Sequence, residues 1–245
     1  MSASSIDCFV LSGGAAQAVV TAVQPAFESS HGCRLVAEFG AVGTMRDRLL
    51  GGTPCDLLVL TEPLIAALAR DGRVDGETAR PLGSVATGIA VTAASSAQPV
   101  TNGAALAALL QAATALYVPD LQQSTAGIHI AAMLEELGLR QTLAARTREF
   151  PNGATAMREL GRDAGAGAVG ITQVTEILFT DGVRLLGELP AEHALRTIYT
   201  AAIARSAGHR DLAARLVEAL TGPGSDALRR RSGFDLGAGS GSSRR

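Results

Sequence analysis

Four turns of this 245-residue chain place glycine, serine or threonine between a predicted strand and a predicted helix. They contain Ser12-Gly13-Gly14, Val42-Gly43-Thr44, Thr61, and the segment from Gln122 to Gly127. The N–H groups in the first turn of a helix have no partner within it, and the helix dipole is positive there. Hydroxyl groups add donors, and glycine lets the backbone approach a ligand closely. The pattern predicts that a small oxygen-rich anion is bound by Ser12, Gly13, Gly43, Thr44, Thr61, Ser124 and Thr125.

Strands and helices alternate along the first part of the chain. Apolar runs predict strands at residues 6–11, 33–39 and 55–60, and helical spacing predicts helices at 15–29 and 44–50. This order is typical of a doubly wound α/β sheet, whose ligands bind beyond the carboxyl ends of the strands. Serine and glycine are common in turns of every kind, so the prediction depends on the turns occurring together at one edge of a sheet.

The rest of the chain continues the alternation. Strands are predicted at residues 85–93, 115–118, 166–172, 185–189 and 197–204. Helices are predicted at 63–69, 103–113, 125–137, 154–162, 211–221 and 225–231. Residues 237–245 form a Gly/Ser-rich segment for which we expect disorder.

The charge of the chain argues against a nucleic-acid partner. The formal net charge is −2, aromatic residues make up 3%, and the one basic run is Arg229-Arg230-Arg231. Nucleic-acid-binding proteins normally carry a broader basic surface. We expect the three arginines to lie at the C-terminus of a helix, where positive charge is favourable.

The sequence contains no motif that is typical of a cofactor site or a metal site. Cys8, Cys33 and Cys55 have neither metal-ligand spacing nor close pairs, and we expect them to be buried, reduced thiols. There is no phosphate-binding loop and no nucleophile elbow. The sequence therefore predicts no cofactor and no metal.

The beginning of the chain bears on localisation. The first residues lead directly into a predicted strand, without a basic segment, a long apolar run or a cleavage site. No stretch approaches the ~18 apolar residues of a membrane helix. As written, the chain is expected in the cytoplasm, or in the periplasm if it is a trimmed mature form.

The run from Phe39 to Thr44, followed by Leu49 to Leu57, resembles the molybdate-binding proteins of ABC transporters. Those proteins have a Phe-small-small-Ser-Gly turn followed by a Gly-Ala-Pro-x-Asp segment. Ser12 falls where that family has its first ligand-contacting serine, and Ala126-Gly127 is similar to the family's Pro-Ala-Gly helix start. The segments Thr221-Gly222-Pro223 and Ser232-Gly233-Phe234 resemble its C-terminal ending.

Two positions depart from that family. The serine before the glycine is Val42, and the tyrosine at a strand end is Gly170. Each change removes a donor for a tetrahedral oxyanion, and we expect the second to open space as well. A site rejects a ligand that leaves its hydrogen-bonding groups unpaired. The departures therefore favour a carboxylate over molybdate.

The resemblance implies the type II periplasmic-binding-protein fold, an α/β fold of two lobes, each a doubly wound, mostly parallel sheet, with the ligand cleft between them. Residues 1–87 and 197–236 are expected to form lobe one, and residues 88–196 lobe two, because the family's chain crosses twice between lobes. It also implies a solute-binding protein, acting as a monomer, whose partners are a small anionic ligand and, if exported, an ABC transporter permease.

A second function comes from an enzymatic branch related to these binding proteins. The segment from Gly170 to Glu176 resembles the branch that includes aconitate isomerase, a cofactor-free enzyme that shifts a double bond in a tricarboxylate. Such a proton shift needs a positioned base, and His129 is the candidate because it follows a predicted helix start and imidazole titrates near neutrality. A histidine there can equally be a packed or solvated residue.

Overall fold

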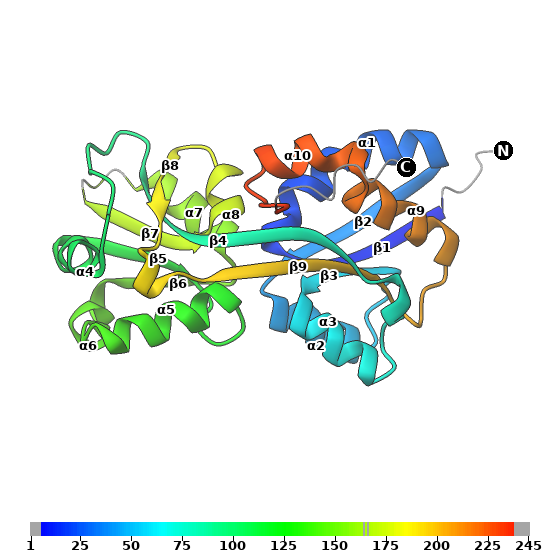
Figure 1. Cartoon of the computed structure of the whole chain (residues 1–245), viewed down its shortest axis with the longest axis horizontal. Helices are drawn as coiled ribbons and strands as arrows, with labels where there is room; N and C mark the ends of the chain where they lie inside the picture. Colours follow the sequence, from blue (N-terminus) through cyan, green and yellow to red (C-terminus); the bar gives the residue numbers. More distant parts are fainter. Residues whose placement is uncertain (1–5, 164, 166, 238–245) are drawn as a thin grey trace, which may run out of the picture. The chain divides into compact units, whose positions relative to one another are not determined.

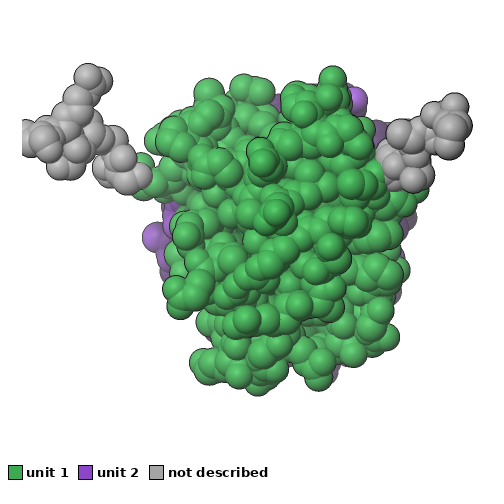
Figure 2. All heavy atoms as spheres, turned by 90° about the vertical axis from the view of Figure 1, so that its right-hand side faces the viewer, with its two compact units in different colours: residues 1–39, 45–85, 197–245 green, residues 40–44, 86–196 purple. Residues whose placement is uncertain are grey.

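The computed structural model describes residues 6–163, 165 and 167–237 (Figure 1). The chain divides into two compact units, coloured separately in Figure 2. Unit 1 holds residues 1–39, 45–85 and 197–245, and unit 2 holds residues 40–44 and 86–196. The boundaries at 85/86 and 196/197 fall inside two strands, β4 (Arg80–Thr92) and β9 (Arg196–Ile203).

Unit 1 is built on a sheet with the strand order β2-β1-β3-β9. Strands β1 (Ile6–Gly13) and β3 (Leu57–Thr61) are parallel, and β9 joins β3 antiparallel. All five residues of β3 are buried, as expected for a central strand apolar on both faces. The other elements are β2 (Cys33–Gly40), α1 (Gln17–His31), α3 (Glu62–Arg70), α9 (Arg210–Thr221) and α10 (Asp226–Arg231). Helix α2 (Val42–Leu50) begins with residues assigned to unit 2 and continues in unit 1 from Met45.

Unit 2 is built on β5 (Ala115–Pro119), which is parallel to both β6 (Thr147–Phe150) and β7 (Ala168–Gln173). Strand β4 pairs antiparallel with β7 and with β8 (Val183–Glu188). Figure 1 shows α5 and α7 on opposite faces of this sheet. The helices are α4 (Gly103–Ala112), α5 (Thr125–Glu136), α6 (Arg140–Leu143), α7 (Gly153–Arg162) and α8 (Val174–Leu178).

The predicted α/β class and most predicted elements are confirmed, with local differences. Strand β6 was not predicted, because its exposed edge carries the polar sequence Thr-Arg-Glu-Phe rather than an apolar run. Strand β4 begins at Arg80, not at residue 85. The first helix is preceded by a 3-10 turn, Gly14–Ala16. The three cysteines are buried and free, and burial raises the pKa of Cys8 and Cys55 to about 12.

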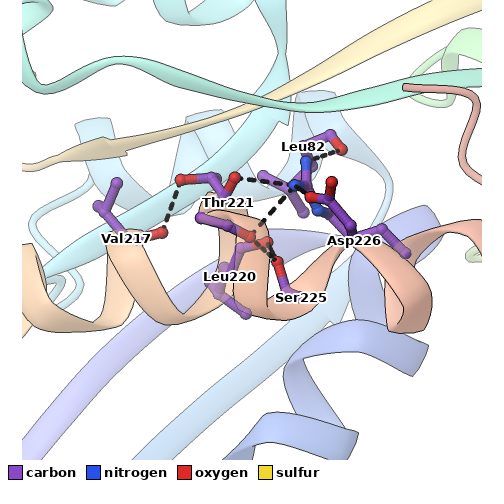
Figure 3. A network of polar contacts seen from close by, with 8 residues as sticks. Leu82, Val217, Leu220, Thr221, Ser225 and Asp226 are labelled. Carbon is purple, nitrogen blue, oxygen red and sulfur yellow. Dashed lines mark hydrogen bonds and ion pairs between the residues drawn. The ribbon is translucent and has the colours of Figure 1, made fainter. Parts of the chain in front are cut away.

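Arg229 differs from the other two arginines of the basic run. They are exposed, whereas Arg229 is buried and donates to the carbonyl oxygens of Leu82 at 2.7 Å and Thr221 at 2.8 Å. It also donates to the carboxylate of Asp226 at 2.6 Å. Figure 3 shows these partners coming from separate segments of unit 1. Arg229 therefore binds the last carbonyl groups of α9 and joins the C-terminal segment to the start of β4.

Candidate functional site

Two of the predicted hydroxyl groups lie at one edge of the sheet in unit 1. Strands β1 and β3 are parallel with Ser12 beside Val59, so Ser12 and Thr61 both lie toward the carboxyl ends of the strands. Ser12 is fully buried, and its Oγ donates to the carbonyl oxygen of Gly13 at 3.0 Å. Thr61 is buried and precedes α3 without making a side-chain cap.

The turn that contains Gly43 and Thr44 belongs to unit 2, and only Thr44 is exposed there. The N–H group of Gly43 donates to the carbonyl oxygen of Gln123 at 3.0 Å. A Cβ atom at Gly43 would lie 3.0 Å from that oxygen and overlap the Gln123 side chain. Glycine is therefore required here for close approach, and its N–H group is occupied by the protein itself.

The start of α5 combines a serine cap with unused donors. The Oγ atom of Ser124 accepts from the N–H group of Gly127 at 3.4 Å, and its carbonyl oxygen accepts from Ile128 at 2.9 Å. The N–H groups of Thr125 and Ala126 have no hydrogen-bond partner within the described residues. Two donors at the positive end of a 12-residue helix are thus free for a ligand.

The start of α7 is filled by a carboxyl group of the protein. Glu176 accepts from the hydroxyl of Thr172 at 2.5 Å and from the N–H groups of Gly153, Ala154 and Gln173. A Cβ atom at Gly153 would overlap both the Thr172 hydroxyl and the Glu176 carboxyl group. Burial raises the pKa of Glu176, although all four hydrogen bonds act in the opposite direction.

The remaining donors of α7 are also satisfied. The Oδ1 atom of Asn152 accepts from the N–H group of Thr155 at 2.8 Å, and its carbonyl oxygen accepts from Ala156 at 3.1 Å. Helices normally leave their first four N–H groups without internal partners. In unit 2 the start of α7 is therefore closed by Glu176 and Asn152, whereas the start of α5 is open.

Three buried polar side chains of unit 2 were not predicted from the sequence. The side-chain O and N atoms of Gln173 and the hydroxyl groups of Thr87 and Thr175 are buried without a hydrogen-bond partner in the described structure. Gln173 is the last residue of β7 and pairs with Thr87 of β4. Polar residues directly after apolar strands are the signal that indicates Ser12 and Thr61, and the same signal marks Gln173.

His129, the candidate base, lies in the second turn of α5. Its Nε2 atom is 2.8 Å from the carbonyl oxygen of His193, so in the matching tautomer Nε2–H is the donor. His193 belongs to the 3-10 turn Ala191–His193, and its Nδ1 atom lies 3.7 Å from the carboxylate of Glu136. The Nε2 atom of His129 is therefore engaged with the protein itself.

The expectation that Gly170 opens space is wrong. A Cβ atom at Gly170 would lie 2.5 Å from Cε of Met157 and 2.8 Å from Cδ2 of Leu160. Both side chains come from α7, which packs directly on β7 at this glycine. The missing tyrosine still removes a donor, but Met157 fills the volume.

Metal-binding clusters and membrane-spanning helices are both lacking in the described part of the chain. Residues 6–163, 165 and 167–237 contain no group of three or more His, Cys, Asp or Glu side chains that could hold a metal ion. Within the same ranges, no helix has the length and apolar character needed to cross a membrane.

Known proteins resemble the chain in sequence and in fold. It is 24% identical to aconitate isomerase from a Pseudomonas species over 222 residues, which cover 86% of this chain and 80% of that protein. The periplasmic molybdate-binding protein of Azotobacter vinelandii superposes with a TM-score of 0.77 at 17% identity, covering 94% of this chain and all of that one. The sulfate-binding protein SubI of Mycobacterium tuberculosis H37Rv gives a TM-score of 0.72 at 20% identity, covering 94% and 86% of the two chains.

These structural likenesses show the fold, which is that of the periplasmic binding proteins, as predicted. The family assignment comes from the sequence itself. Residues 9–235 match the family model described as bacterial extracellular solute-binding protein. This match spans nearly all of the described residues, so the chain belongs to the bacterial extracellular solute-binding protein family.

Proposed function

We propose that this solute-binding protein binds a small carboxylate anion and delivers it to an ABC transporter permease outside the cytoplasm. The observation that carries the proposal is the pair of free N–H groups at Thr125 and Ala126. An anion is the natural partner of two such donors at a helix start, because the helix dipole adds to their hydrogen bonds. The donors of α7 are already used by Glu176 and Asn152.

Three features support a carboxylate over a tetrahedral oxyanion. Val42 and Gly170 lack the donors that the molybdate-binding pattern has at these positions. The N–H group of Gly43 is bound to Gln123. A relative that covers most of the chain is named for aconitate, a tricarboxylate. Among the predicted contacts we retain Ser12, Gly13, Thr44, Thr61, Ser124 and Thr125 as proposed ligand donors.

A thermal-shift screen tests the ligand class. Di- and tricarboxylates should raise the melting temperature more than molybdate, tungstate or sulfate, because a ligand at ~100 times its dissociation constant stabilises the folded state by about 2.7 kcal/mol. A clear preference for molybdate or sulfate would refute the carboxylate proposal. It would indicate that the protein binds an inorganic oxyanion for transport.

The second candidate is a cofactor-free isomerase that moves a double bond in an unsaturated carboxylate, and the likeness to aconitate isomerase favours it. A base would remove a proton from one carbon and return a proton to another, with the charge of the intermediate stabilised by the α5 donors. His129 is the proposed base and would act through Nδ1, since Nε2 is bound to His193.

Turnover in heavy water separates an enzyme from a binding protein. The full chain is mixed with cis- or trans-aconitate and followed by NMR for interconversion or deuterium uptake. His129→Ala should abolish turnover and keep ligand-induced stabilisation if His129 is the base. If turnover survives, the base must be sought among Glu62, Glu176 and ordered water. If no carboxylate that binds is turned over, the isomerase candidate is eliminated.

A further inference from the structure

Neighbouring side chains at the end of β7 lie on opposite faces of the sheet in unit 2, because side chains alternate along a strand. Thr172 points to the α7 face, where it bonds Glu176. Val169 and Ile171 lie on the other face, in one buried cluster with Ala126 of α5. Gln173 follows Ile171 by two residues, so its side chain continues the α5 face.

Thr87 lies on this same face. In the antiparallel ladder of β4 and β7, Ile89 is opposite Ile171 and Thr87 is opposite Gln173. Ile89 belongs to the cluster that contains Ile171 and Ala126. Directly opposite residues have Cβ atoms about 4.5–5.5 Å apart. The unpartnered side chains of Gln173 and Thr87 are therefore neighbours. They form the next pair on this face of the sheet after Ile171 and Ile89.

The open start of α5 lies at the same edge of the sheet. Strands β5 and β7 are parallel, so their carboxyl ends share that edge. Helix α5 begins a short turn after β5 ends. Ala126, in the first turn of α5, packs in the same apolar cluster as Ile171 and Ile89, the pair next to Gln173 and Thr87 in the ladder. The free N–H groups of α5 and the unpartnered side chains of Gln173 and Thr87 thus converge on one place.

The unpartnered atoms are nearly inaccessible. Gln173 is 2% exposed and Thr87 is 1% exposed, yet both atoms of the Gln173 amide and the Thr87 hydroxyl lack a partner in the described structure. Buried polar groups in native proteins are almost always hydrogen-bonded, and each exception calls for an explanation. The amide needs both an acceptor, for its N–H groups, and a donor, for its oxygen.

We propose that Gln173 and Thr87 are specificity-determining residues that bind a hydroxyl group of the ligand, so that the ligand is a hydroxycarboxylate. A carboxylate alone, like an inorganic oxyanion, only accepts hydrogen bonds and leaves the amide oxygen of Gln173 unsatisfied. A hydroxyl group both donates and accepts. The inference rests on the proposed function, since it takes the carboxylate of the ligand to lie at Thr125 and Ala126.

Matched pairs of acids test the inference on the full chain. Calorimetry compares malate with succinate, and citrate with tricarballylate, because each pair differs by one hydroxyl group. We expect the hydroxylated acid of at least one pair to bind about 10- to 100-fold more tightly, since a site that bonds a hydroxyl rejects the analogue lacking it. In Gln173→Leu and Thr87→Val this ratio should fall toward one, while the affinity for the acid without the hydroxyl stays within about threefold.

Each outcome has one meaning. Gln111→Leu, the same change at an exposed glutamine of α4, is the matched control and should keep the ratio. Equal affinities within both pairs overturn this inference but leave carboxylate binding intact. Failure of all four acids to bind refutes the inference as well as the proposed function for these acids. A ratio that survives both substitutions, together with a loss of unliganded stability, assigns the two side chains to a structural water instead.

Discussion

The hydroxyl group of Thr172 donates a 2.5 Å hydrogen bond to the carboxyl group of Glu176, four residues later in the chain. Glu176 also accepts from its own helix start at Gln173, in the manner of a capping box, and from two N–H groups of α7. One buried carboxyl group thus caps two helices. This arrangement closes the start of α7 to a ligand.

The raised pKa of Glu176 predicts a pH dependence of stability. The folded protein holds the proton to higher pH than the unfolded chain, whose carboxyl group ionises near the ordinary value of 4.5. The free energy of unfolding should therefore fall as the pH rises from 4.5 through the raised pKa. Urea unfolding across this range should show the slope in the native protein and not in Glu176→Gln. Equal slopes in both proteins would contradict the assignment.

The side chain of Arg229 should contribute far more to the free energy of unfolding than that of its neighbour Arg230. Arg229→Met leaves the carbonyl groups of Leu82 and Thr221 without their donor, and should lower the free energy of unfolding by about 1–3 kcal/mol. Arg230→Met, at an exposed position, should change it by less than about 0.5 kcal/mol. Arg229→Lys should not restore stability, because lysine lacks the planar fork that reaches several acceptors. Equal effects at the two positions would disprove the structural role.

Adding even a methyl group at Gly43 should destabilise the fold. In Gly43→Ala the new Cβ atom crowds the carbonyl oxygen of Gln123, and chemical unfolding should show a loss of about 1–3 kcal/mol. At Gly187, in β8 of the same unit, a new Cβ atom would meet no other atom within 4 Å, so Gly187→Ala is the matched control and should be neutral or stabilising. A neutral Gly43→Ala would mean that the contact with Gln123 is not formed in solution.

Ser12 is proposed to exchange an internal acceptor for the ligand. Its hydroxyl donates to Gly13 in this structure, and turning it to an anion would give one charge-assisted hydrogen bond. Ser12→Ala should weaken carboxylate binding by about 1.5–3 kcal/mol in calorimetry, and Thr44→Ala should act in the same direction. Ser225→Ala, at another buried serine, should lower stability but keep the affinity. Unchanged affinity in both Ser12→Ala and Thr44→Ala would place the site elsewhere.

Local sequence was sufficient for most of the fold. Four of the five buried residues of β3 form a continuous apolar run, and α5 begins at Thr125, where the helix was predicted to begin. Strand β6 was not predicted because an edge strand needs no apolar face. The start of β4 was not predicted because Arg80 is charged and Pro81 is typical of turns.

The candidate site was less accessible to sequence reasoning because its decisive contacts are distant along the chain. Gln173 pairs with Thr87, and Gly43 donates to Gln123. No local pattern predicts that Met157 fills the space beside Gly170. The hydroxyl and glycine residues of the turns could be found one by one, but which donors remain free depends on the assembled sheet.

The most direct test of the proposed anion site follows individual backbone amides during a carboxylate titration by ¹⁵N NMR. Thr125 and Ala126 should show the largest shift changes, saturating with the affinity measured by calorimetry, because their N–H groups are free to bind the anion. Gly153 and Ala154, the matching positions of α7, should move little because Glu176 already occupies them. Saturating binding that leaves Thr125 and Ala126 unchanged would contradict the central claim.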